Sequence, residues 1–211
     1  FTDRRQRQMC IRDSQFIDND GAQDGGAVYL HQIIGASVAA CTFVGNTALN
    51  GGALIVDNSP GLSFVLTDSH FEDNVAMFSG GAVDLTVSSG ATGSVTIERC
   101  DFLSNATTTN VVGGGAITTT GLVEGTIDNS RFEANTTPGE GGAIYTSADA
   151  MRIANGVFIE NTASRGGAVR ATKVTDVVQC SFWGNEATRG SAVLSHGILE
   201  PVERVITNCI A

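Results

Sequence analysis

The sequence predicts an all-β fold: a parallel β-helix, or solenoid, with three strands per coil and about seven coils. One short sequence motif recurs seven times at intervals of 24 to 31 residues, a period that is typical of solenoid repeats. The unit tolerates insertions and is rich in Gly, Thr, Val and Asn, which favours strands and turns over helices. With 211 residues and 42% hydrophobic content, the chain can bury one continuous core.

Each unit contains F-x-x-N, followed by G-G-A and one aliphatic residue. The phenylalanines are Phe16, Phe43, Phe71, Phe102, Phe132, Phe158 and Phe182. The asparagines are Asn19, Asn46, Asn74, Asn105, Asn135, Asn161 and Asn185. The glycine pair begins five to nine positions after each asparagine, and its only variant is Gly190-Ser191.

These repeated positions predict which residues stack in the core. We expect the phenylalanines to form a stack, with small residues two positions earlier, such as Cys41 and Cys100, on the same inner face. Small polar residues such as Asp68 and Asn129 come just before and predict a corner. The asparagines mark a second corner, where identical amides one coil apart can pass hydrogen bonds along a ladder.

The glycine pair predicts a third corner, after which a third strand begins. Glycine there permits a close backbone approach or a positive φ. In this strand, residues such as Val28 and Leu30 should face inward, and the residues between them should face outward. The residues predicted to face outward are Tyr29, Ile55, Asp84, Thr118, Tyr145, Arg170 and Leu194.

We assign residues 14–211 to a single β-helix domain. We expect its C-terminal end to be truncated or uncapped, because a further unit opens at Val205 and stops before its phenylalanine, whereas solenoids normally end in a polar cap. Residues 1–13 allow two interpretations. Residues 5–14 resemble a peptide translated from adapter DNA, whereas residues 11–16 also fit the first strand and corner of a coil.

Charge and hydropathy limit the partners. The net charge is −10 and the pI is near 4.6, so we expect no nucleic-acid partner, because such a partner needs a basic face. No apolar run approaches the roughly 18 residues of a membrane helix. We therefore expect no direct membrane insertion of this segment.

The repeated F-x-x-N and G-G-A-[ILV] motifs resemble the repeat of the chlamydial polymorphic outer membrane proteins and related bacterial surface proteins. The resemblance covers residues 14–193. It implies a right-handed parallel β-helix like an autotransporter passenger, secretion to the cell surface in association with the outer membrane, and a role in adhesion. The partner that it implies is a receptor or glycan on a host cell or a neighbouring cell.

No convergent catalytic constellation stands out in the sequence. Glycosidases and lyases with a β-helix fold need paired carboxylates, or a calcium site beside a base, on one outer face. In one aligned column, however, the carboxylates of Asp18, Asp73 and Glu160 fall on the first, third and sixth coils and do not cluster. The three histidines lie in unrelated positions of their units. We therefore expect no enzyme activity, no metal site and no cofactor.

Three functions stay open on this basis. The first is a non-catalytic extracellular protein, an adhesin or passenger-type stalk, whose binding loops are longest at residues 106–113, 86–93 and 195–202. The second is a structural subunit that stacks end to end into an extracellular filament, and so forms a homopolymer. The third is a polysaccharide lyase or glycosidase.

One charged column precedes the glycine pair. Glu140, Arg165 and Arg189 should stack on successive coils, with Arg170 nearby in sequence. Arginines one coil apart repel each other unless a carboxylate or another anion joins them. The column therefore predicts either a surface salt-bridge row or a contact for an anion or acidic glycan, made by Arg165, Arg170 and Arg189.

The cysteines also allow two states. Four of the five occupy the small interior column, where a free thiol packs as a small hydrophobe. Cys180 and Cys209, on adjacent coils, also have a spacing that a disulfide could bridge. We expect free thiols.

Overall fold

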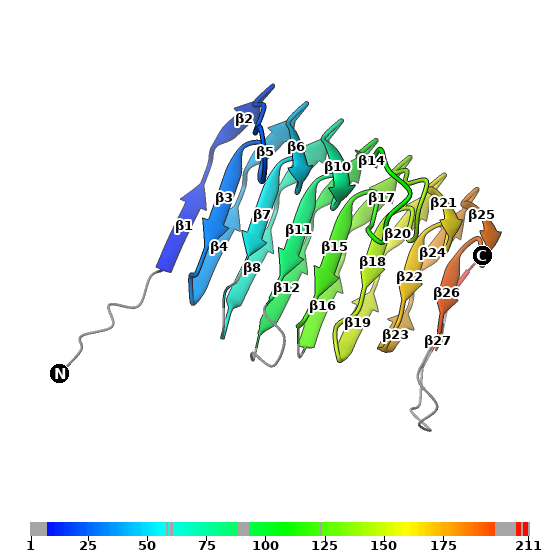
Figure 1. The fold of residues 1–211 in the computed structure, drawn as a ribbon. Helices are drawn as coiled ribbons and strands as arrows, with labels where there is room; N and C mark the ends of the chain where they lie inside the picture. The colour runs from blue at the N-terminus through cyan, green and yellow to red at the C-terminus, as the bar shows by residue number, and fades with distance from the viewer. Residues whose placement is uncertain are drawn as a thin grey trace.

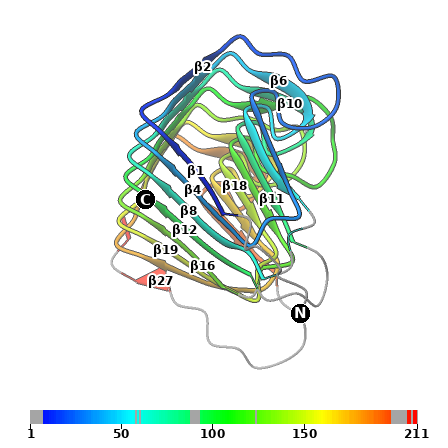
Figure 2. The ribbon, with the colours of Figure 1, turned by 90° about the vertical axis from the view of Figure 1, so that its left-hand side faces the viewer.

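The computed structural model describes residues 8–57, 59, 61–87, 93–122, 124–196, 206–207 and 209–210. Within these residues it contains β-strands and no helix. Figure 1 shows the strands side by side as the chain winds from the N-terminal coil to the C-terminal coil. Figure 2, seen from the N-terminal end, shows the coils one behind another. The chain is a parallel β-solenoid of about seven coils, as predicted.

Sheet I forms the first side of each coil. Its strands are β1 (Gln8–Arg12), β4 (Gly35–Ala39), β8 (Ser63–Thr67), β12 (Ser94–Glu98), β16 (Glu124–Asp128), β19 (Ala150–Ala154), β23 (Val174–Val178) and β27 (Ile206–Thr207). Burial alternates along the strands in the middle of this sheet, as Phe64 and Leu66 show in β8. β1 pairs in parallel with β4, and Ile11 lies beside Val38. Residues 8–12 thus form the first strand of the stack.

Sheet II forms the second side and carries the phenylalanines. Its strands are β2 (Gln15–Ile17), β5 (Thr42–Val44), β9 (His70–Glu72), β13 (Asp101–Leu103), β17 (Arg131–Glu133), β20 (Val157–Ile159) and β24 (Ser181–Trp183). Each strand has three residues with the phenylalanine at its centre. Only that central side chain points into the core, because side chains alternate along a strand.

Sheet IV closes the coil after the glycine pair. Its strands are β3 (Val28–His31), β7 (Leu54–Asp57), β11 (Val83–Thr86), β15 (Ile117–Thr120), β18 (Ile144–Thr146), β22 (Val169–Ala171) and β26 (Val193–Ser195). The strands of sheets I, II and IV are the three strands per coil that the sequence predicts.

Sheet III is a short fourth element that the sequence did not reveal. It lies between the asparagine and the glycine pair, and its strands are β6 (Thr47–Asn50), β10 (Val75–Ser79), β14 (Ala106–Thr107), β21 (Thr162–Arg165) and β25 (Glu186–Arg189). A three-stranded part and a two-stranded part are connected through isolated bridges at Thr136. This sheet covers the outer face of sheet IV.

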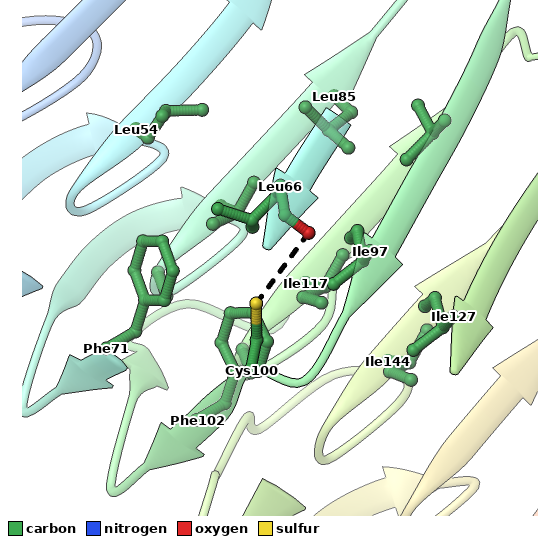
Figure 3. Close-up of a cluster of buried hydrophobic side chains, with 14 of the residues drawn as sticks. Leu54, Leu66, Phe71, Leu85, Ile97, Cys100, Phe102, Ile117, Ile127 and Ile144 are labelled. Atoms are coloured by element: carbon green, nitrogen blue, oxygen red, sulfur yellow. Dashed lines mark hydrogen bonds between the residues drawn. The ribbon is translucent and has the colours of Figure 1, made fainter. Parts of the chain in front are cut away.

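The phenylalanine stack is confirmed. Successive ring centroids lie between 4.6 Å, for Phe43 and Phe71, and 5.0 Å, for Phe132 and Phe158, with ring planes within 9° of each other. This spacing follows the distance between neighbouring strands, about 4.8 Å. Figure 3 shows Phe71 and Phe102 beside the aliphatic columns of sheets I and IV. The core is thus one continuous column along the axis.

The asparagine ladder is also confirmed. The side-chain Nδ2 of Asn74 donates to Oδ1 of Asn105 at 2.9 Å and to the carbonyl oxygen of Phe43 at 3.0 Å. Its Oδ1 accepts from the backbone N–H and from Nδ2 of Asn46, at 3.0 and 2.8 Å. Every hydrogen-bonding position of this buried amide is used, and the pattern repeats along the stack.

The corners depend on left-handed backbone positions. The residue before the small interior position has a positive φ, 51° at Asp68 and 48° at Asn129. The residue before each ladder asparagine does too, as at Asp73 with a φ of 53°. At the third corner, the two positions require glycine for different physical reasons. Gly80 has a φ of 59°, whereas a Cβ on Gly81 would overlap the carbonyl oxygen of the next coil.

The predicted outward column of the third strand does point away from the central core, but most of its members are covered rather than exposed. Ile55, Asp84, Thr118, Tyr145 and Arg170 are all buried, with exposed fractions of 2 to 8%. These side chains do leave the central core, but sheet III and the glycine pair fold over them. Tyr29, in the first coil, is exposed. The outer face of sheet IV and the inner side of sheet III therefore enclose a second, polar layer, which we call the outer layer.

Candidate functional site

Among the described residues, the outer layer contains one buried carboxylate. Asp84 is 3% exposed; its Oδ1 accepts a hydrogen bond from the Thr86 hydroxyl at 2.7 Å, and the Ser79 hydroxyl contacts its Oδ2. Ser79 Oγ also lies 3.1 Å from Oδ1 of Asn50, whose Nδ2 donates to Asp24 at 2.8 Å. Burial raises the pKa of Asp84, and the hydrogen bonds from Ser79 and Thr86 oppose that rise only in part. This network is a structural part of three successive coils.

The same layer holds one of the three predicted arginines, Arg170, farther along the stack. Arg170 is 8% exposed, and its Nε donates to Oε2 of Glu140 at 3.0 Å. Its Nη1 donates to the carbonyl oxygens of Ala171 and Leu194, at 2.9 and 3.4 Å. These partners hold Arg170 in place beneath sheet III. A ligand contact at Arg170, as predicted from the sequence, is therefore not supported by its position.

The two other arginines of the cluster lie at the surface. Arg165 donates from Nη1 to Oε1 of Glu140 at 2.8 Å, and half of its side chain is exposed. Arg189 is exposed and lies beside Arg165 in the register of β21 and β25. Within the described part of the chain, no carboxylate forms an ion pair with Arg189. Of the predicted surface salt-bridge row, the structure therefore contains the ion pair of Arg165 with Glu140, and Arg189 is not part of it.

A second surface feature begins with a β-bulge in β10. Ala76 pairs with Ala48 and Ser79 pairs with Asn50, so β10 has one residue more than β6 between these pairs. Such a bulge bends the strand and redirects side chains. Met77 and Phe78 occupy it, and they are 43% and 36% exposed.

The loop of the next coil packs against this bulge. Residues 108–113 extend the longest described segment between ladder and glycine pair, drawn in green beside β14 in Figure 1. The backbone N–H and the hydroxyl of Thr109 both donate to the Met77 carbonyl oxygen, at 3.1 and 2.5 Å. Val111 and Val112 of this loop are 40% and 53% exposed. We call Met77, Phe78, Val111 and Val112 the apolar corner.

Sequence reasoning selected the loop at 106–113 but missed the bulge. The signal was present, since Val75–Ser79 has one residue more than Thr47–Asn50 and places two large apolar residues in the segment of variable length before the glycine pair. The other two predicted loops, at 86–93 and 195–202, lie largely outside the described residues.

A shallow groove of about 330 Å³ crosses the outer face of sheet I. Thr96, Thr126, Glu124 and Arg152 are among the residues that line it. Among the described residues no three His, Cys, Asp or Glu side chains are arranged to hold a metal ion.

The interior cysteines are free thiols in the structure. Cys100 and Cys180 are buried, and each sulfur lies near backbone carbonyl oxygens. Burial raises the pKa of the Cys100 thiol to about 12. These cysteines therefore act as small core residues, as their column predicts.

The comparisons with known proteins give one match. Residues 129–147 match the model of the Chlamydia polymorphic membrane protein repeat. This stretch runs from the corner of β16 through Phe132 and Asn135 to the glycine pair and β18, and so spans both halves of the motif. Neither the curated proteins nor the solved structures give a match. In the described residues we find no helix with the length and hydrophobicity that a membrane crossing needs. The fifth unit of this chain, which contains Phe132 and Asn135, is thus similar to the Chlamydia polymorphic membrane protein repeat.

Proposed function

We propose that the chain is a non-catalytic, surface-exposed β-helix of the passenger type, which binds a partner protein through the apolar corner. The observation that carries this proposal is the apolar corner itself. A bulge in one coil and the longest described loop of the next coil, joined by hydrogen bonds from Thr109 to the Met77 carbonyl oxygen, carry four exposed apolar side chains on neighbouring segments.

The physical character of the corner supports a protein partner. Methionine and aromatic residues are enriched in protein interfaces, and methionine adapts to irregular partner surfaces. An exposed apolar group on a chain with a net charge of −10 is the kind of feature that marks an interaction site. The hydrogen bonds from Thr109 to Met77 hold bulge and loop together before any partner binds, which reduces the entropy lost on binding.

The repeat type supports the cellular setting. A repeat found in membrane proteins of Chlamydia fits a chain displayed at the outer membrane or cell surface. A partner on a host cell or on a neighbouring cell would meet the apolar corner there. The regular stack of coils would then serve as the stalk that presents it.

An adhesion assay tests this proposal. Beads coated with the purified chain are counted on host cells and on bacterial cells, with the double variant Phe78→Ser, Val112→Ser on matched beads. Each apolar side chain removed from an interface costs about 1.5–3 kcal/mol, so we expect binding to weaken by about tenfold or more.

The matched control is Val65→Ser, Val157→Ser. Both valines are also exposed, at 37%, but they lie on sheets I and II, away from the corner. Adhesion that survives the corner variant, or that falls equally in the control, would contradict the proposal. Circular dichroism should show that both variants keep the β-sheet spectrum.

A further inference from the structure

We propose that Arg165 and Arg189 form a binding site for the carboxylate or sulfate groups of an acidic polysaccharide. This site is separate from the apolar corner and does not depend on the proposed protein partner. It lies on sheet III at the other end of the stack, where β21 and β25 pair.

The charges of the cluster leave a local positive surplus. The Glu140 carboxylate pairs with two arginines. Its distance to the surface residue Arg165 is 2.8 Å, and its distance to the buried residue Arg170 is 3.0 Å. The buried partner, Arg170, is held by Glu140 and by two backbone carbonyl oxygens. Three arginines against one glutamate leave a net charge of two positive in the cluster. Glu140 is shared by Arg165 and Arg170, and Arg189 forms no ion pair with a carboxylate of the described residues.

The fold holds the two surface arginines at a fixed separation. Arg165 and Arg189 are register neighbours in parallel strands, so their backbones lie about 4.8 Å apart. Stacked like charges are unfavourable in a sheet. An anionic group between the two guanidinium groups would remove that repulsion, and a guanidinium binds carboxylate and sulfate oxygens through paired N–H donors.

The surroundings favour a ligand that reaches the surface from solvent. Arg189 is exposed, and half of the Arg165 side chain is exposed. Glu140 also fixes one end of Arg165 through a 2.8 Å hydrogen bond, which leaves its other N–H groups for a second acceptor. A polymer offers repeated anionic groups, so a weak single contact is strengthened by rebinding along its length.

Fluorescence polarisation with labelled heparin and labelled polygalacturonate tests the site, and unlabelled inorganic sulfate serves as competitor. At physiological salt the screening length is about 8 Å, so repulsion from the acidic remainder of the chain is screened. We expect Arg165→Gln, Arg189→Gln to weaken binding of at least one polymer by about tenfold or more. Sulfate that competes only at far higher concentration would show that the polymer, rather than the free ion, is the ligand.

Arg131→Gln is the matched control, because Arg131 is an exposed arginine on sheet II that pairs with Glu133. It removes a surface charge without touching the cluster. The proposal is overturned if the wild type binds neither polymer, if the double variant binds as well as the wild type, or if Arg131→Gln weakens binding equally. Because Arg165 and Arg189 are exposed, we expect an unchanged melting temperature, which separates lost binding from lost folding.

Discussion

Asp84 illustrates what single residues contribute to the outer layer. The Ser79 hydroxyl has one hydrogen but two neighbouring acceptors, Oδ1 of Asn50 and Oδ2 of Asp84. When Asp84 is protonated, it donates to Ser79, and Ser79 then donates to Asn50, so each hydrogen has one acceptor. When Asp84 is charged, one of these contacts loses its hydrogen. The network is therefore complete with a neutral carboxyl group.

This arrangement predicts a pH-dependent stability. Burial raises the pKa of Asp84 above its unfolded value of 3.8, and the negative charges of Asp24 and Asp57 add to the rise. The contribution of the neutral Asp84 carboxyl group to folding stability is complete below its pKa in the unfolded chain, and it is lost as the pH rises through its pKa in the folded chain. In Asp84→Asn the side chain stays neutral, so we expect the free energy of unfolding to exceed that of the wild type at neutral pH.

Urea denaturation at several pH values checks this prediction. The difference between Asp84→Asn and the wild type should grow as the pH rises above 3.8. Asp101→Asn, on the exposed surface of sheet II, is the control and should leave the pH profile nearly unchanged. A wild type that gains stability relative to Asp84→Asn as the pH rises would show that the buried group is charged at no cost.

At the scale of elements, the third corner shows why the repeat keeps two glycines. The first adopts a positive φ, and the second lies directly against the backbone of the neighbouring coil, as at Gly80 and Gly81. This close approach lets sheet III fold back over sheet IV and form the outer layer. Ser191 takes the second position in the last described coil, where it is exposed.

Gly81→Ala tests this close approach. The new Cβ would overlap the carbonyl oxygen of Gly115 and contact the backbone of Ala106, so either the corner shifts or the coils separate. We expect a loss of about 3 kcal/mol in the free energy of unfolding. Gly35→Ala is the control, because a Cβ there meets its nearest neighbour at 3.6 Å, an ordinary contact. Equal stability of the two variants would refute the explanation.

Across the whole molecule, stability depends on neighbouring coils rather than on local contacts. Each coil buries its inner face only against the coils beside it, so the energy of the stack is a sum over interfaces. Phe102 is fully buried between Phe71 and Phe132, whereas Phe16, in the first coil, is only partly buried. The same substitution should therefore have different costs at the two places.

We expect Phe102→Ala to cost about 3–5 kcal/mol in the free energy of unfolding and Phe16→Ala clearly less. Far-UV circular dichroism during chemical denaturation is the suitable measurement, because the only tryptophan, Trp183, is already 75% exposed in the folded chain. Equal losses for the two variants would contradict a stack whose energy depends on neighbours on both sides.

The repeat determined the solenoid from sequence alone, because its regularity has one physical cause. Residues such as Phe71, Asn74 and Gly80 recur in register, and parallel strands one coil apart place identical residues next to each other. The stack, the ladder and the corners follow from that rule, and so they could be predicted without a structure.

Only the tertiary structure decided what lies on the outside. The position of Arg170 in its strand predicted an exposed side chain, but the fold of sheet III buries it against Glu140. The apolar corner likewise depends on a bulge in one coil that meets a loop of the next. Both results come from segments that differ between coils, and a contact between unlike segments is set by how the chain folds back in space rather than by the period of the repeat.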